Sequence, residues 1–370
     1  MLLRHYLFIR TLYYEKKNLT YHEQTEISYT ERLRILLKDM PPYVKDYFRS
    51  VEGKTSAKTR ISYAYDLQVF FNYLLDRNPS LSHKIINDIT LEDLNQLTSN
   101  DIEEYMEYLK YYTTETSEQK NSESSIARKV SALRSFFNYY YKKELLFRNV
   151  AMQVDMPKIH EKAIIHLEPD EVAILLDYMD QCENQLSKRQ QSYFRLTKQR
   201  DIAIVTLFLG TGIRVSECVG LDITDINFRE NSLRVQRKGG NEAILYFGSE
   251  VEHALLDYIN GSRKQASLSA QNGHENALFF SLQKRRISVH AVENLVRKYT
   301  EAVVTQKKIT CHKLRSTYGT ALYQETGDIY LVADALGHKD VNTTKKHYAS
   351  IKEQNRRKAA SAIKLRETQD

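Results

Sequence analysis

The sequence has few cysteines and no long apolar run. Its three cysteines, Cys182, Cys218 and Cys311, lie far apart and form no Cys-x-x-Cys pair. This spacing argues against a disulfide framework or a cysteine zinc site and favours a reducing cytosol. No apolar run approaches the roughly 20 residues that cross a bilayer, so we expect no membrane association. The opening stretch is apolar but is interrupted by basic residues and lacks a cleavage site, which predicts an N-terminal extension rather than a signal peptide.

Proline and glycine are also scarce, and their distribution predicts two kinds of domain. All five prolines fall before residue 170, and only one of the 12 glycines, Gly53, falls before residue 210. A glycine-poor front half with apolar residues at helical spacing indicates an all-helical domain, whereas the back half needs tight turns and hairpins. We therefore predict a mostly α-helical chain with a small antiparallel β-sheet, in which a helical N-terminal domain precedes an α+β domain. A length of 370 residues allows two or three domains with separate cores.

Four segments of the front half carry apolar residues at i, i+3, i+4 and i+7 and predict amphipathic helices. They are residues 43–50, 59–77, 99–112 and 124–146. Ser99 or Asn100 and the pair Ser124 and Ser125 are the expected N-caps. The polar stretch 113–121 predicts an interhelix loop. The predicted boundaries are an extension over 1–30, a helical domain over 31–153, a linker over 154–168, an α+β domain over 169–350 and a helical tail over 351–370.

In the back half, helices alternate with one hairpin. We expect a helix from Pro169, which suits a first turn, and a buried helix over 200–210 that ends at Gly210. Residues 232–247 alternate with period two around Lys-Gly-Gly-Asn, which predicts a β-hairpin. Further helices are expected over 249–259, 288–300, 312–324 and 330–337. The net charge of +7 permits a polyanionic partner without establishing one.

Six side chains in a fixed order carry the chemistry. They are Arg214, Lys238, His312, Arg315, His338 and Tyr348. Two arginines can clamp a phosphodiester and stabilise its pentacoordinate transition state. A lysine on a hairpin can protonate a leaving alkoxide, and histidines can donate hydrogen bonds or accept the proton of a phenol. A tyrosine can attack phosphorus and conserve the bond energy as a phosphotyrosine.

Each of these residues, taken singly, has an ordinary interpretation. Tyr348 is one of 26 tyrosines, Arg214 can pair with Glu217 at i, i+3, and Lys238 can be a solubilising turn residue. A lone histidine is more often a helix-terminus or core residue. The ordered set is different, because two histidines and one tyrosine at this spacing arise by chance in only about 0.02 of such chains.

With Arg214 in TGIRVSE, His312-x-x-Arg315, Leu-Gly-His338 and Tyr348 ten residues later, the chain resembles the tyrosine site-specific recombinases of the phage integrase superfamily. The segment 312–348 resembles the Xer subfamily, and the resemblance covers roughly residues 30–365. It implies a helical core-binding (SAM-like) N-terminal domain and an α+β catalytic domain.

The resemblance implies a role for each residue of the set. Arg214 and Arg315 would hold the scissile phosphate, His312 would accept a proton or contact the phosphate, and His338 would support the transition state. Tyr348 would be the nucleophile. Lys238 would be the general acid, with Arg237 and Lys313 as alternatives, and Glu217 would orient Arg214. No cofactor and no metal is implied.

The implied partners are duplex DNA with a specific recombination site, a homotetramer on paired sites and a DNA translocase. Arg128, Lys129 and Arg134 on the helix over 124–141 are candidate DNA contacts, and a solvated helix face is the alternative. The tail over 351–370 would dock on the next protomer, or it is a frayed basic tail.

The function that follows is resolution of chromosome dimers at a dif-like site, by a bacterial cytoplasmic protein associated with the nucleoid. An integrase of a phage or conjugative element is the alternative, although residues 1–40 show no hairpin signal of an arm-binding sheet. A type IB topoisomerase is disfavoured by the front domain. A non-catalytic DNA-binding protein would not keep the full set, and a helical interaction scaffold would lack salt-dependent duplex binding.

Overall fold

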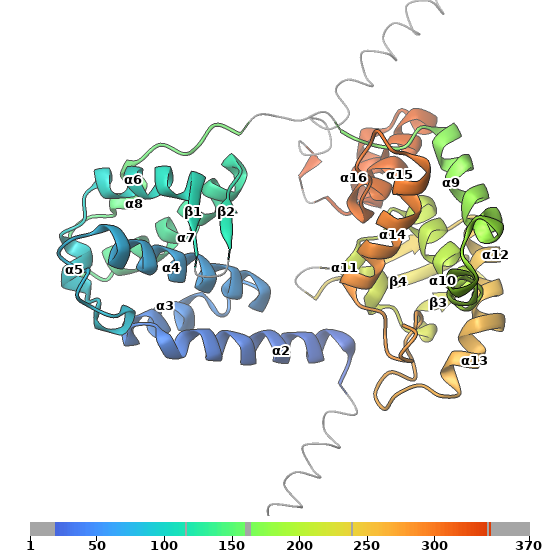
Figure 1. Cartoon of the computed structure of the whole chain (residues 1–370), viewed down its shortest axis with the longest axis horizontal. Coiled ribbons are helices and arrows are strands. Elements are labelled where there is room, and N and C mark those ends of the chain that lie inside the picture. The colour runs from blue at the N-terminus through green and yellow to red at the C-terminus, as the bar shows by residue number, and fades with distance from the viewer. Residues whose placement is uncertain (1–18, 115–116, 160–163, 238–239, 339, 342–370) are drawn as a thin grey trace, which may run out of the picture. The chain divides into compact units, whose positions relative to one another are not determined.

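The computed structural model describes residues 19–114, 117–159, 164–237, 240–338 and 340–341 (Figure 1). Contacts divide the chain into two compact units, residues 1–161 and 162–370, which we call unit 1 and unit 2. The chain is mostly helical with small antiparallel sheets, which confirms the predicted fold class. Within the described ranges, no helix is both long and apolar enough to cross a membrane.

Unit 1 is built from helices and one short hairpin. The elements are α2 (Tyr21–Leu36), η1 (Leu37–Asp39), α3 (Pro42–Val51), α4 (Ala57–Arg77), η2 (Ile86–Asp88), α5 (Leu91–Asn95), α6 (Ser99–Lys110), β1 (Tyr111–Thr113), β2 (Glu118–Lys120), α7 (Glu123–Tyr141) and α8 (Val150–Gln153). Helix α2 packs against α4 and spans the boundary predicted at residue 30. The four helices predicted in this half correspond to α3, α4, α6 and α7.

The N-caps of α6 and α7 lie before the predicted serines and asparagine. Thr98 caps α6 because its hydroxyl accepts from the backbone N–H of Asp101, while the Asp101 carboxylate accepts from the Thr98 N–H at 2.7 Å. This reciprocal pair satisfies two free donors at once, which a serine one residue later cannot do. Ser122 caps α7 by a single bond, since its hydroxyl accepts from the backbone N–H of Ser125.

Residues 113–121, predicted as a loop, contain half of a hairpin. Strands β1 and β2 pair antiparallel, with Tyr111 opposite Lys120 and Thr113 opposite Glu118. Almost all side chains of β1 and β2 are exposed, so the hairpin has no buried face and its strands show no alternation of apolar and polar residues. Periodicity therefore could not reveal them.

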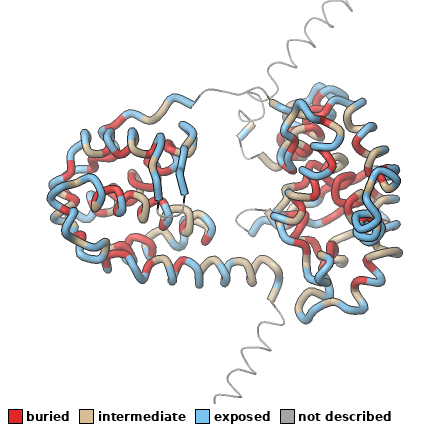
Figure 2. The backbone as a smooth tube through the Cα atoms, in the orientation of Figure 1, coloured by how far each residue is buried: buried red, intermediate tan, exposed pale blue. Residues whose placement is uncertain are grey.

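The core of unit 1 contains a cluster of aromatic rings among buried aliphatic side chains. Figure 2 shows the buried backbone segments of this unit in red. Tyr47, Phe70, Phe71, Phe136 and Phe137 are fully buried on α3, α4 and α7. The rings meet mainly edge to face, for example Tyr47 on Phe136 with centroids 5.3 Å apart. Such pairs add about 0.5–1.5 kcal/mol beyond the burial of their area. This core holds α7 against α3 and α4.

Unit 2 surrounds a three-stranded antiparallel sheet of order β3-β4-β5 with helices. Its elements are α9 (Pro169–Gln181), η3 (Cys182–Gln185), α10 (Lys188–Thr211), α11 (Val215–Gly220), η4 (Ile223–Asp225), β3 (Ile226–Asn227), β4 (Ser232–Gln236), β5 (Glu242–Tyr246), α12 (Ser249–Tyr258), the π-helical turn η5 (Ile259–Arg263), α13 (Lys264–Ser267), α14 (Val289–Val303), α15 (Cys311–Thr326) and α16 (Ile329–Ala335). Helix α10 packs against α12 and α15, and its second half is buried.

Helix α10 ends at Gly212 and not at the predicted Gly210. Gly212 has φ +62°, and its N–H donates to the carbonyl of Phe208, which is the usual glycine stop. Gly210 lies inside the helix, where a Cβ would clash with the side chain of Val251 on α12. That glycine therefore serves close helix packing rather than helix termination.

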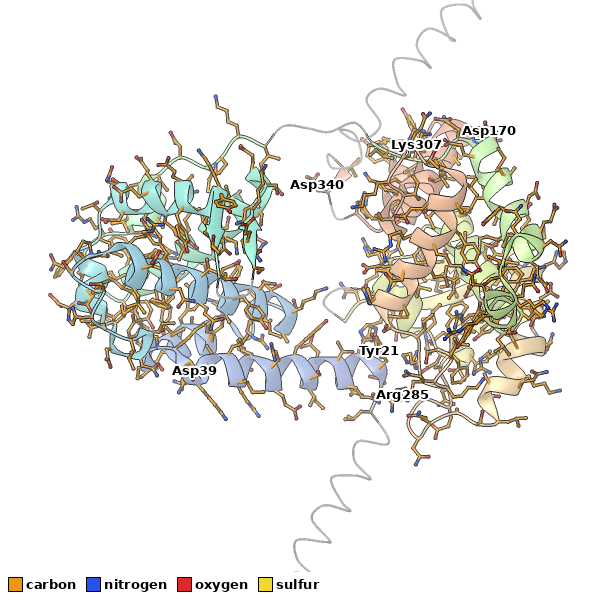
Figure 3. All side chains as sticks on the ribbon, viewed as in Figure 1. Tyr21, Asp39, Asp170, Arg285, Lys307 and Asp340 are labelled. Atoms are coloured by element: carbon orange, nitrogen blue, oxygen red, sulfur yellow. The ribbon has the colours of Figure 1, made fainter. Side chains whose placement is uncertain are left out.

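The chain enters unit 2 tied to the helix α15. The N–H of Leu167 donates to the hydroxyl of Thr317 at 2.9 Å. Lys307, just before α15, donates to the Glu171 carboxylate at 2.6 Å, in the first turn of α9. Figure 3 shows Lys307 beside the start of α9, where Asp170 is labelled. Two separate hydrogen bonds thus attach the start of unit 2 to α15 and to the segment before it.

Candidate active site

Three segments of unit 2 meet at Gly212. They are the end of α10, the helix α15 and the turn that follows α16. A Cβ at Gly212 would clash with the ring of Tyr318 on α15 and would lie 3.0 Å from the Leu336 side chain. Burial raises the pKa of Tyr318 above its ordinary value, and Arg315 opposes that rise. A glycine is therefore required for this approach as well as for the left-handed backbone.

Arg214 lies at the N-cap of α11 and is held by Glu217. The Arg214 N–H donates to Glu217 Oε2 at 3.0 Å, and its Nη1 donates to Oε1 at 2.8 Å. The Glu217 side chain is only 4% exposed, while that of Arg214 is 36% exposed. One buried carboxylate thus fixes both the backbone and the guanidinium, which leaves part of the guanidinium facing solvent.

Arg315 reaches the same place from α15. It is buried, and its guanidinium donates to the carbonyl oxygens of Gly212 and Leu336. Arg214 Nη2 also donates to the Leu336 oxygen and to that of Gly337, both at 3.1 Å. The two arginines therefore converge on one main-chain oxygen, although they are about a hundred residues apart in sequence. Glu217 forms an ion pair with Arg214 and so offsets part of the positive charge at this point.

The two histidines lie on the segments that carry or contact these two arginines. His312 is exposed in the first turn of α15, three residues before Arg315. His338 is half-buried directly after Gly337, and its backbone N–H donates to the carbonyl of Ala333 at 2.9 Å. The structure thus brings His312, Arg315, Arg214 and His338 to adjoining segments. Lys238 and Tyr348 lie outside the described residues.

The hairpin of β4 and β5 also reaches the turn after α16. Arg237 follows β4, and its Nη2 donates to the carbonyl of Ala335 at 3.3 Å. Its guanidinium fills the space where Gly337 would carry a Cβ. Sequence reasoning named Arg237 only as an alternative general acid and missed this contact. The one sign of this contact in the sequence was the glycine at position 337, which has φ +58° in the structure. The other alternative, Lys313, is half-buried on α15.

Burial disfavours the reactive thiolate form of the two cysteines near this site. Cys311 directly precedes His312, and burial raises the pKa of its thiol to about 12. Cys218 on α11 is fully buried, and burial raises its pKa well above the ordinary range. Both thiols therefore stay protonated near neutral pH and behave as small apolar residues.

The residues of α7 that were predicted to contact DNA make hydrogen bonds within unit 1. Arg128 and Lys129 both bind the Asp66 carboxylate, which is buried on α4. Arg134 donates to the carbonyls of Ala151 at 2.8 Å and Val154 at 2.5 Å. Lys129 is buried, whereas the Arg128 side chain is 46% exposed. Of the three, Arg128 has the best access to a phosphate.

Comparison with known proteins gives the family of both units. Residues 165–355 match the phage integrase family, and residues 44–144 match the N-terminal SAM-like domain of phage integrases. The chain is 32% identical to the tyrosine recombinase XerC of Caldanaerobacter subterraneus over 334 residues, which cover 87% of this chain and 85% of that one. It is also 32% identical to the tyrosine recombinase XerS of Lactococcus lactis, over 86% of this chain and 94% of that one.

Solved structures show the same fold. The recombinase XerH, in a post-cleavage complex with a palindromic difH substrate, aligns with a TM-score of 0.59 and 20% identity, over 83% of this chain and 80% of that one. A lambda integrase dimer bound to a COC′ core site aligns with a TM-score of 0.57 and 15% identity, over 82% of this chain and 93% of that one.

Proposed function

Because the chain belongs to the phage integrase family and is a tyrosine recombinase of the Xer type, an enzyme that cleaves and rejoins DNA, we propose that it acts at a specific duplex site through a 3′-phosphotyrosyl intermediate and resolves chromosome dimers at a dif-like site. The observation that carries the chemistry is the convergence of Arg214 and Arg315 on one oxygen. A single acceptor between two guanidinium groups is the arrangement that a phosphate oxygen needs.

In the proposed cleavage step, the phenol oxygen of Tyr348 forms a bond to phosphorus as the bond from phosphorus to the 5′-oxygen breaks. The phenol proton passes to His312, and Lys238 gives a proton to the departing 5′-oxygen. Arg214 and Arg315 stabilise the charge on the non-bridging oxygens, with His338 beside them. Rejoining reverses these transfers when a 5′-hydroxyl of the other duplex attacks the phosphotyrosine.

The proposed role in dimer resolution rests on the Xer relatives. The identity to XerC and XerS extends over both units and not only over the catalytic residues. The XerH structure that shares this fold holds a difH site. In this proposal the protein acts in the bacterial cytoplasm at the nucleoid, as a homotetramer on two paired sites, and is activated by a DNA translocase. Residues 351–370, outside the described ranges, would link neighbouring protomers.

An integrase of a mobile element is the second candidate. The fold is shared with lambda integrase and with the Tn1549 transposon integrase, the latter with a TM-score of 0.57. Against it, residues 21–36 form the helix α2, and a helix is not the arm-binding sheet expected of many integrases. The two candidates differ in the DNA site that the protein recombines.

Trapping on a nicked suicide substrate tests the proposal. The substrate carries a dif-like site, and wild type is compared with Tyr348→Phe. We expect a denaturation-resistant protein–DNA adduct that is absent in the variant. An adduct that persists in Tyr348→Phe would assign the nucleophile to another tyrosine. Tight binding without any adduct would reject the catalytic proposal for this site, and recombination only at a mobile-element attachment site would favour the integrase.

A further inference from the structure

The contact between Arg237 and the turn after α16 is not explained by the chemistry of the arginine pair. Arg237 is the residue after β4, and its backbone closes the hairpin, since its N–H donates to Asn241 at 2.7 Å and its carbonyl accepts from Gly240 at 3.2 Å. Its side chain leaves the hairpin and donates to Ala335. Backbone and side chain therefore connect two segments that are about a hundred residues apart.

The turn is shaped to receive this guanidinium. Gly337 has φ +58°, and any Cβ there would overlap the guanidinium of Arg237. The N–H of Gly337 donates to Asp334 at 2.7 Å, which closes the turn and leaves the face of the glycine open. A planar guanidinium can lie flat on such a face, whereas a compact ammonium cannot cover it.

The contact is maintained despite an unsatisfied donor. Arg237 Nε is buried, and among the described residues it has no hydrogen-bond acceptor. An exposed arginine at a hairpin tip would leave its Nε–H in water, where the donor is satisfied. The guanidinium is thus held in this position by packing on Gly337 and by the bond to Ala335, and the contact is a specific one.

We propose that Arg237 is a positioning residue, which fastens the β4–β5 hairpin to the turn that carries His338. This inference rests on the proposed function, because the residue it would place is Lys238, which directly follows Arg237 in the sequence. Arg237 contacts the same turn whose Leu336 and Gly337 carbonyl oxygens accept hydrogen bonds from Arg214. One side chain thereby links the hairpin that carries the proposed general acid to the turn that Arg214 contacts.

A first experiment measures the attachment without any catalysis. The full-length protein is digested briefly with a protease that cuts only after lysine, and cleavage at Lys238 is followed by mass spectrometry. Arg237→Gln is expected to be cut at least fivefold faster than wild type. The matched control is Arg234→Gln, on the same hairpin, where the side chain is 56% exposed and pairs with Asp225. Equal cutting of Arg237→Gln and the control would overturn the proposal.

A second experiment measures the consequence for the acid. Single-turnover cleavage is compared on an ordinary phosphodiester and on a 5′-bridging phosphorothiolate, whose leaving group needs no proton. Arg237→Gln is expected to slow the first by 10-fold or more and the second by less than threefold, with DNA affinity unchanged. The double variant with Lys238→Ala should be no slower than Lys238→Ala alone.

Equal slowing of both substrates, additivity with Lys238→Ala, or a loss of DNA affinity that accounts for the slower cleavage would each overturn the positioning role. Failure of the proposed function gives a different result, because wild type would then form no adduct while the protease measurement still decides the attachment. Melting temperatures of the variants are compared first, so that a global loss of stability is not mistaken for release of the hairpin.

Discussion

Arg214 and Arg315 both donate a hydrogen bond to the carbonyl oxygen of Leu336. This shared acceptor places the two guanidinium groups side by side at one main-chain oxygen. A main-chain oxygen carries only a partial charge, so a phosphate oxygen, with a full charge, is the stronger acceptor for the same donors. Preorganised donors stabilise a transition state with little rearrangement during the reaction.

Glu217 is expected to matter for cleavage through Arg214. Glu217→Gln keeps the size of the side chain but removes the charge that binds the Arg214 backbone and guanidinium. Hydrogen bonds between charged groups contribute about 1.5–3 kcal/mol, so cleavage should slow by roughly 10- to 100-fold. Single-turnover trapping measures this. Exposed Glu230→Gln is the control, and an equal rate in both variants would remove Glu217 from this role.

Lys238→Ala should affect only the substrate that needs an acid. Cleavage of an ordinary phosphodiester is expected to slow by about 10²- to 10⁴-fold, the usual contribution of general acid catalysis. A 5′-bridging phosphorothiolate should be cleaved at nearly the wild-type rate. The ratio of the two rates is the measurement, and a ratio equal to that of wild type would assign the acid to another residue, such as Lys313.

Substitution of Arg128 and of Arg134 should distinguish a residue that contacts DNA from one that only stabilises unit 1. Both make hydrogen bonds within unit 1, but the Arg128 side chain is exposed whereas Arg134 is half-buried. If Arg128 binds a phosphate, Arg128→Gln lowers the slope of log affinity against log salt by about 1. Arg134→Gln should lower thermal stability and leave that slope unchanged. Duplex binding at several salt concentrations measures the slopes, and identical slopes for wild type and Arg128→Gln would remove Arg128 from the interface.

The aromatic core should make unit 1 sensitive to alkali. Burial raises the pKa of Tyr47 from its ordinary value of 10.0 to about 12, although the bond to Ser135 opposes the rise. Between these pH values the unfolded chain has lost the proton that the folded chain retains, so the free energy of unfolding falls as pH rises. The loss is about 1.4 kcal/mol per pH unit for such a tyrosine.

Urea unfolding of the chain at pH 9, 10 and 11 tests this dependence. In Tyr47→Phe, the free energy of unfolding should fall less steeply above pH 10 than in wild type, because one ionising tyrosine is removed. At pH 8 the variant should be less stable than wild type, because it lacks the hydrogen bond to Ser135. A variant that loses stability with the same slope as wild type would show that Tyr47 is not protected from ionisation.

The helices could be predicted from the sequence because their apolar residues repeat at helical spacing over long segments. Their ends depended on particular contacts, as Thr98 and Gly212 show, since a cap is chosen by the backbone geometry around it. The structure places the predicted Arg214, Arg315, His312 and His338 on adjoining segments, whereas Lys238 and Tyr348 lie outside the described residues and stay predictions. The convergence on Leu336 could not be predicted, since a main-chain oxygen has no signature in the sequence.

The hydrogen bonds that attach the start of unit 2 to α15 and to the segment before it have a mechanical consequence. Leu167 is bonded to Thr317, which lies two residues after Arg315 on the same helix, and Lys307 ties the start of α9 to the segment before that helix. A force applied to the chain at this entry is therefore borne by α15 directly, without an intervening flexible loop. Tension in the chain ahead of unit 2 would load α15, the helix that carries Arg315, which we propose holds the scissile phosphate.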